Sequence, residues 1–211
     1  MLEYIGFADE FNFYFMSKIS SILLTSVLLA ACSPQSTATV PSRDTEPVVE
    51  EAIEEIIVEE KRFKCPSCSP NEKVALEFLQ DRGIKDKYAL ATVMGNIKQE
   101  SKFLPNICEG GARVNYNQCH SGGYGLIQWT TANRYRGLGV FASRYLCKAE
   151  EMKCQLRYMT TEPQWIRASE TFKTPGLSVD SYMNAAYYWL GWGIHGNRTY
   201  YTNQYVNLYT S

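Results

Sequence analysis

The sequence predicts a mainly α-helical domain of the α+β class, in which several helices are accompanied by a small β-hairpin. Apolar residues recur at spacings of three and four through much of residues 70–211, which is the period of an amphipathic helix. No long alternation of apolar and polar residues marks a strand, and the hairpin candidate lies around residues 113–128. The composition, 45% hydrophobic and 20% charged, is that of a globular chain.

Residues 1–32 are expected to form an export segment. Within residues 16–32, Lys18 precedes an apolar run that is too short to span a bilayer comfortably. The end of this run, Leu-Ala-Ala-Cys32, is similar to the lipobox of bacterial lipoproteins, which implies cleavage before Cys32 and a lipid on its thiol. Residues 1–15 are acidic where a signal is basic, so we expect translation to start at Met16. An ordinary secretory signal and an anchor helix are the alternatives.

Residues 33–69 are expected to form an acidic linker before the domain at 70–211. Residues 46–61 have the pattern of a short amphipathic helix, and a frayed linker is the alternative. Residues 1–69 carry 5 Lys or Arg and 11 Asp or Glu, a net −6, whereas residues 70–211 carry 16 and 11, a net +5. A basic domain suits a polyanionic partner, either nucleic acid or a cell-wall polymer, although a solvated surface explains the excess equally well.

Six of the seven cysteines remain once Cys32 is assigned to the lipid, and an even number suits disulfides in an exported domain. Local bridges are expected between Cys65 and Cys68 and between Cys108 and Cys119. Cys147 and Cys154 would lie about 10.5 Å apart in one straight helix, so either a turn separates them or each pairs elsewhere. A redox Cys-x-x-Cys and a zinc site made by residues 65, 68, 147 and 154 are the alternatives. We expect no metal and no cofactor.

The helices follow from apolar spacing and from the residues that begin and end them. Ser69 and Pro70 suit an N-cap and a first helical residue, and Ser178 suits a second N-cap. The expected helices cover about 70–83, 86–102, 130–145 with breaks at Gly137 and Gly139, 152–162 with a stop at Pro163, 178–190 and 201–208, and a loop is expected at 172–177.

The most informative stretch is residues 94–129. In the helix expected at 86–102, which overlaps the start of this stretch, Leu90, Val93 and Ile97 share one apolar face, which places Glu100 at the border of that face. A carboxyl group at such a border is partly desolvated, and desolvation raises its pKa. The stretch ends with the glycine-rich residues 122–125, which run into Leu-Ile-Gln-Trp at 126–129.

Two parts of this stretch carry a resemblance to a known family. Glu100-Ser101 followed by Gly-Leu-Ile-Gln128 matches the E-S…G-L-x-Q fingerprint of lysozyme-like lytic transglycosylases and goose-type lysozymes. The fuller pattern, G-N-I-K-Q-E-S-K-F…G-Y-G-L-I-Q-W-T…R, resembles the phage-tail lysozyme family more closely and covers roughly residues 72–205. It implies a lysozyme-like fold with the hairpin beside a cleft, and peptidoglycan as the substrate.

The resemblance also implies roles for particular residues. Glu100 is expected to be the general acid of a glycosidase, and Glu109 is our choice for a second carboxylate, ahead of Glu162, Glu170 and Asp180. Substrate contacts are expected from Ser101, Tyr124, Gln128, Trp129 and Arg134, with Trp129 as a wall of the cleft. Most aromatic residues of the C-terminal half are expected in the core instead: Trp165, Tyr182, Tyr187, Tyr188, Trp189, Trp192, Tyr200, Tyr201 and Tyr205.

The function that these features indicate is a muramidase that cleaves the glycan strands of the bacterial cell wall. A lytic transglycosylase is one alternative, and a wall-binding or virion structural protein that lacks turnover is the other. We expect the protein to be exported, in the periplasm or on the outer membrane through a lipid on Cys32, or virion-associated if a phage encodes it. No motif indicates nucleic-acid binding.

Overall fold

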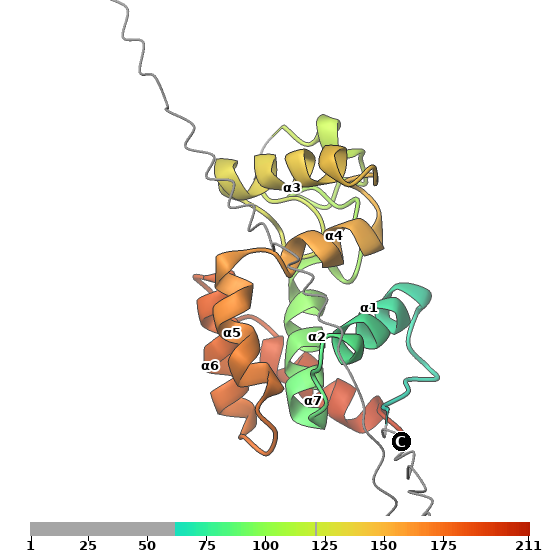
Figure 1. Ribbon diagram of the computed structural model, residues 1–211, viewed down its shortest axis with the longest axis vertical. Coiled ribbons are helices and arrows are strands. Elements are labelled where there is room, and N and C mark those ends of the chain that lie inside the picture. The colour runs from blue at the N-terminus through green and yellow to red at the C-terminus, as the bar shows by residue number, and fades with distance from the viewer. Residues whose placement is uncertain (1–61, 121) are drawn as a thin grey trace, which may run out of the picture. The chain divides into compact units, whose positions relative to one another are not determined.

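The computed structural model describes residues 62–120 and 122–211, and within them the chain is helical (Figure 1). The proposed export segment and most of the proposed linker lie outside the described residues. These described residues form seven α-helices: α1 (Pro70–Asp81), α2 (Lys87–Ser101), α3 (Ala132–Arg144), α4 (Met152–Met159), α5 (Pro163–Lys173), α6 (Val179–Leu190) and α7 (Arg198–Leu208), with a 3-10 turn at Tyr116–Gln118. Among the described residues, no helix is both long and apolar enough to cross a membrane.

Helix α2 is the centre of the domain. It packs along α7 and also contacts α6, α1 and α5, and α3 and α4 lie together at one end (Figure 1). Residues Ala89 to Ile97 are all buried, so this helix is surrounded on every side over that length. Gly95 permits the close approach of α7, because a Cβ atom there would lie 2.6 Å from the backbone nitrogen of Thr202.

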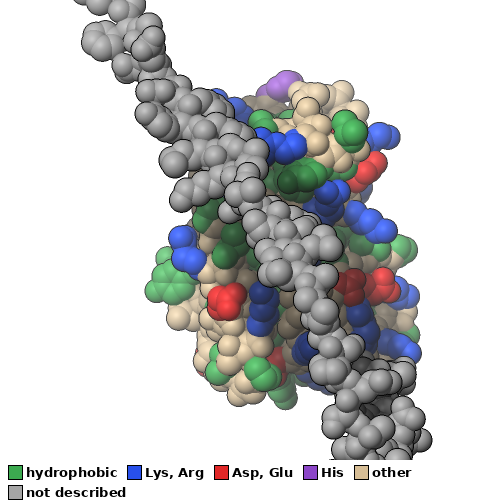
Figure 2. All heavy atoms as spheres, in the orientation of Figure 1, with side chains coloured by type: hydrophobic (Ala, Val, Ile, Leu, Met, Phe, Trp, Pro, Cys, Tyr) green, Lys and Arg blue, Asp and Glu red, His purple; other side chains and the backbone are tan. Residues whose placement is uncertain are grey.

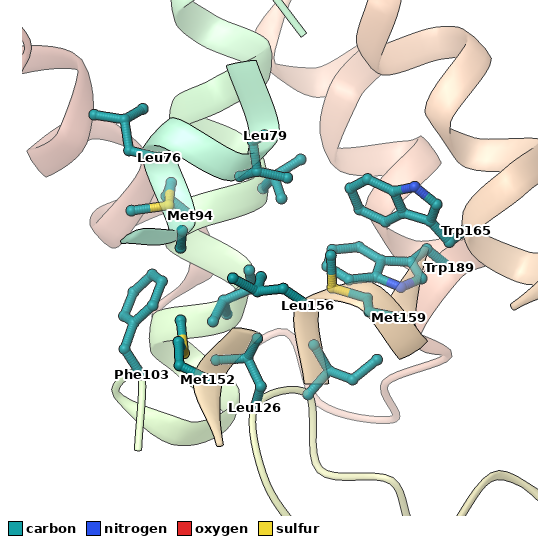
Figure 3. Packing of buried hydrophobic residues seen from close by; sticks show 14 of the residues in the cluster. Leu76, Leu79, Met94, Phe103, Leu126, Met152, Leu156, Met159, Trp165 and Trp189 are labelled. Atoms are coloured by element: carbon teal, nitrogen blue, oxygen red, sulfur yellow. The ribbon is translucent and has the colours of Figure 1, made fainter. Parts of the chain in front are cut away.

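The core lies between α2 and the helices around it. Leu76 of α1 lies beside Met94 of α2, Leu156 of α4 lies in the middle of the cluster, and Met159 of α4 lies beside Trp189 of α6 (Figure 3). The rings of Trp165 and Trp189 meet edge to face with centroids 4.8 Å apart, which joins α5 to α6. Within the described residues these contacts form one hydrophobic core.

The ends of the first helices agree with the sequence signals. The Ser69 hydroxyl accepts from the amide of Glu72, and the Glu72 carboxylate accepts from the amide of Ser69, which is a capping box. Asp86 caps α2 by accepting from two backbone amides. Lys102 ends α2 in the left-handed conformation, with φ of 52°, and Phe103 follows with φ of 59°.

Two expectations about the helices are corrected. Helix α3 runs without a break, because Gly137 and Gly139 leave room for the hydroxyl groups of Tyr158 and Tyr116. Pro163 is expected to stop a helix, but it begins one. It occupies the first position of α5, where the missing N–H loses no hydrogen bond within the helix. The loop expected from residue 172 therefore begins only after Lys173.

The expected hairpin is also corrected. Residues 107–129 form isolated bridges in place of regular strands: Cys108 and Tyr124 pair, and Tyr124 also pairs with Trp129. Positive φ angles at Gly122, Gly125 and Gln128 turn the chain too often for a ladder to extend. The segment is a folded loop beside the end of α2.

The described residues contain three disulfides. They join Cys65 to Cys68, Cys108 to Cys119 and Cys147 to Cys154. Both expected local bridges are confirmed. For the third pair, residues 145–151 form the turn between α3 and α4 that brings the two Cα atoms to 5.8 Å.

Candidate active site

Glu100 lies in the last turn of α2, at the border between the buried face and solvent, as the helical pattern predicts. Its side chain is 17% exposed, so the carboxyl group is mostly desolvated and still reachable. Burial is the largest influence and raises the pKa of Glu100 above its ordinary value, whereas the charges of Arg198 and Arg134 oppose the rise. The net direction is upward, which favours a carboxyl group that can hold a proton.

Arg198 is the residue that the sequence reasoning missed. It is the first residue of α7, and its Nη2 atom donates to Oε1 of Glu100. Its Nη1 atom donates to the carbonyls of Ile194 and His195 at 3.0 and 2.8 Å, and its guanidinium lies 4.3 Å from the centre of the Trp192 ring. Only 4% of its side chain is exposed.

The position of Arg198 lowers the stability of the folded domain. A cation at the first turn of a helix opposes the macrodipole, and its Nε atom is buried without a hydrogen-bond partner among the described residues. Burial lowers the pKa of Arg198 even though Glu100 opposes the shift. The pKa values of both partners therefore move toward the neutral forms, which means that desolvation outweighs their attraction.

Ser101 connects α2 to the folded loop. Its hydroxyl donates to the carbonyl of Leu126 at 2.7 Å, and the amide of Leu126 donates to Oε1 of Gln155 at 2.7 Å. The Ser101 side chain is buried and already bonded, so it holds the end of α2 to the loop and is not exposed for the expected contact with substrate.

Gln155 is a second residue without a sequence signal. Its side chain is fully buried on α4, and its Nε2 atom donates to the carbonyls of Pro105 and Ala149, both at 2.6 Å. Gly125 has φ of +71°, and a Cβ atom there would lie 2.6 Å from the Gln155 amide group. Gln155 therefore holds the loop from its buried side. Its close approach explains why residue 125 of the motif is a glycine.

Two aromatic residues of the motif lie in the interior. Tyr124 and Trp129 are both fully buried, so the expectation that they contact substrate, with Trp129 as a cleft wall, is corrected. Trp129 donates from Nε1 to Glu162 at 3.0 Å, because a buried indole N–H needs an acceptor. Tyr124 packs edge to face against the rings of Tyr116 and Tyr135. Both rings stabilise the loop.

Arg134 and Glu162 form a bidentate ion pair beside these rings. Nε and Nη2 of Arg134 donate to the two carboxylate oxygens at 2.7 and 2.8 Å, and only 4% of the Glu162 side chain is exposed. Glu162 accepts a third bond from Trp129, so its carboxylate is committed to structure and is not available as a second catalytic group. The third guanidinium nitrogen of Arg134, Nη1, is not part of this ion pair.

Gln128 and Glu109 are the expected site residues that face solvent. Gln128 is half-buried, with φ of 51°, and its Nε2 atom donates to the carbonyl of Gly125 at 3.0 Å. Glu109 is exposed, and its Oε2 atom accepts from the amide of Gly123 at 3.1 Å. The charged side chains that shift the pKa of Glu100 are Arg198 and Arg134, and Glu109 is not one of them.

Comparison with known families adds the deciding observation. The family model for phage tail lysozyme matches residues 70–202, from the first residue of α1 into α7. The chain belongs to the phage tail lysozyme family. No match was found among curated proteins.

Membership in the phage tail lysozyme family agrees with the helical fold and gives the domain a lysozyme-like, cell-wall-lytic character. It indicates peptidoglycan as the substrate and fits a virion-associated or exported protein. The matched region of this phage tail lysozyme domain contains Glu100, Gln128, Arg134 and Arg198.

Proposed function

We propose that the domain is a muramidase that cleaves the glycan strands of peptidoglycan with Glu100 as its general acid. The observation that carries the proposal is the position of this carboxyl group in the last turn of the buried helix α2. The group is mostly buried but reachable from solvent, and burial raises its pKa. A glycosidic oxygen leaves as an alcohol only if a proton reaches it, and a carboxyl group whose pKa is raised keeps that proton to a higher pH than an ordinary glutamate does.

Arg198 has two effects on this acid. Its hydrogen bond fixes the orientation of the carboxyl group, and its charge stabilises the carboxylate that remains after the proton has left. Because Arg198 is held by two backbone carbonyls and the Trp192 ring, the pair needs little rearrangement during the reaction.

Glu109 is our proposal for a second carboxylate. It would either form a glycosyl intermediate, which requires carboxyl groups about 5 Å apart, or activate a water, which requires about 6.5–9.5 Å. The loop that carries Glu109 is tied to the rest of the motif by the Cys108–Cys119 disulfide and by the bond to Gly123.

A lytic transglycosylase is the second candidate. It is favoured by the surroundings of Glu100, whose pKa responds to two arginines and to no carboxylate. Such an enzyme needs one protein acid, because the N-acetyl group of the substrate assists and an anhydro sugar is released. Gln128 and the third nitrogen of Arg134 would bind the sugar hydroxyls or the N-acetyl group in either route.

The test is the release of soluble fragments from purified cell wall by Glu100→Gln and wild type. We expect the variant to lose about 10²–10⁴-fold of the rate, which is the usual contribution of a general acid. Glu77→Gln, an exposed position on α1, is the matched control and should retain full activity. Undiminished release by Glu100→Gln would refute the proposal. Mass spectrometry of the fragments separates the two routes, because reducing and anhydro ends differ by one water.

The non-catalytic alternative makes a different prediction for the wild type. A wall-binding or virion structural protein would be retained on insoluble peptidoglycan and would release no fragments. The lipid on Cys32 is a further proposal, supported by the lipobox pattern alone; labelling with a radioactive fatty acid should be lost in Cys32→Ala.

A further inference from the structure

Several aromatic rings expected in the core lie on the surface instead, and they connect through Trp192 to the arginine that contacts the candidate acid. Tyr187 is 46% exposed, Tyr188 is 70% exposed and Ile194 is 84% exposed, and Trp192 is half-buried between them and Arg198. Large exposed apolar side chains that gather in one place indicate a binding surface, whereas single ones do not.

The rings form a continuous series that begins at the acid. The guanidinium that contacts Glu100 lies 4.3 Å from the Trp192 ring, and the Trp192 and Tyr187 centroids are 5.3 Å apart. Tyr187 and Tyr188 follow at 5.6 Å. The series therefore runs from the end of α2 across the α6–α7 connection and onto the exposed face of α6.

Polar groups continue the series beyond Tyr188. This residue lines a groove of about 300 Å³ between α5 and α6, together with Gln164, Arg167 and Thr171. Amide, guanidinium and hydroxyl groups are the partners that sugar hydroxyl and N-acetyl groups require, and rings offer faces to the apolar side of a pyranose. A mixture of apolar surface and a few polar groups is typical of a ligand site.

We propose that Trp192, Tyr187, Tyr188 and the α5–α6 groove form a platform that binds N-acetyl sugar units of the glycan strand on one side of the bond at Glu100. This proposal rests on the proposed function, because the glycan is its substrate. Figure 2 shows green hydrophobic side chains and blue Lys and Arg side chains interspersed on the visible part of the drawn face.

The positions of the four tryptophans provide a direct optical test. Trp129, Trp165 and Trp189 are each 4% exposed or less, so Trp192 is the tryptophan whose fluorescence a surface ligand would change. The experiment titrates Glu100→Gln protein, which holds substrate without turnover, with short and long N-acetylglucosamine oligomers. We expect long oligomers to change the emission and to protect it from a soluble quencher, and we expect Trp192→Phe in the same background to abolish both effects.

Affinity for insoluble peptidoglycan gives the second readout. Tyr187→Ala and Tyr188→Ala in the Glu100→Gln background should each weaken binding about threefold to tenfold, a typical value for a lost ring contact. Tyr88→Ala is the matched control, since Tyr88 is also 46% exposed and also lies on a helix, and it should bind as the parent does. Circular dichroism melting confirms that each variant is folded.

Two results would overturn the platform. One is unchanged peptidoglycan affinity in both folded tyrosine variants, and the other is a sugar-dependent fluorescence change that persists in Trp192→Phe. Binding of the rings to lipid vesicles with no loss of glycan affinity in the variants would also contradict it. A failure of this kind leaves the loss of turnover in Glu100→Gln unaffected, so it is distinguishable from a failure of the proposed function.

Discussion

The guanidinium of Arg198 contacts the carboxylate of Glu100 across 98 positions of the sequence, from the first residue of α7 to the last turn of α2. The contact exists because α7 packs along α2, and because Gly95 and Thr202 allow the two backbones to approach closely. The state of the candidate acid therefore depends on a helix that contributes no residue to the motif.

Replacing Arg198 by Met should move the pH dependence of activity. Arg198 lowers the pKa of Glu100 against the larger effect of burial, so its loss should raise that pKa further. Since the acid must be protonated, the rate falls as pH rises through this pKa, and the alkaline limb of the profile should shift to higher pH. The measurement is kcat/KM for cell-wall release across pH. A variant that loses activity equally at every pH would show a purely structural role.

Glu100 should also make stability depend on pH in a defined direction. Because its pKa is raised in the folded chain, the folded state binds more protons than the unfolded state between the two pKa values. Its contribution to the free energy of unfolding is therefore fully present below the unfolded pKa and is lost as pH rises through the folded pKa. Urea unfolding of wild type and Glu100→Gln over this range checks the prediction: the difference between them should change with pH only in that window.

Gln155→Leu should destabilise the domain and loosen the loop. The change leaves the amide of Leu126 and the carbonyls of Pro105 and Ala149 buried without partners. Each unsatisfied group costs about 1–3 kcal/mol, so a total of about 3 kcal/mol or more is expected in urea unfolding. Gln164→Leu, at a half-buried position on α5, is the control and should change stability by less than about 0.5 kcal/mol. Equal stability of the two variants would contradict the role given to Gln155.

Local signals made α2 and its surroundings predictable. The apolar spacing placed Glu100 at the border of the buried face, and Ser69 and Asp86 form caps of the kind that their side chains favour. The Cys65–Cys68 and Cys108–Cys119 bridges were predictable because neither pair lies in a predicted helix, whereas a straight helix through residues 147–154 would have kept its two cysteines apart.

Long-range contacts were not predictable from one sequence. Nothing local to Arg198 or Gln155 shows that the first meets Glu100 or that the second is buried behind Leu126. The buried position of Trp129 depends on Glu162, which supplies an acceptor from 33 residues away. The sequence shows which side chains are polar or aromatic. Whether such a side chain points into the core or toward solvent depends on packing that only the folded chain shows.

The two larger disulfide loops offer a matched pair for the role of the Glu109 loop. Removing Cys108–Cys119 or Cys147–Cys154 by paired Cys→Ala changes should cost about 3 and about 2.5 kcal/mol, from loops closed over sequence separations of 11 and 7. The stability losses should therefore be similar, as thermal melting can show. Only the first pair holds the segment that carries Glu109 and contacts Gly123, so only its loss should lower the turnover rate at temperatures well below melting. Equal activity of the two folded variants would exclude a catalytic role for the loop and would favour the single-acid route.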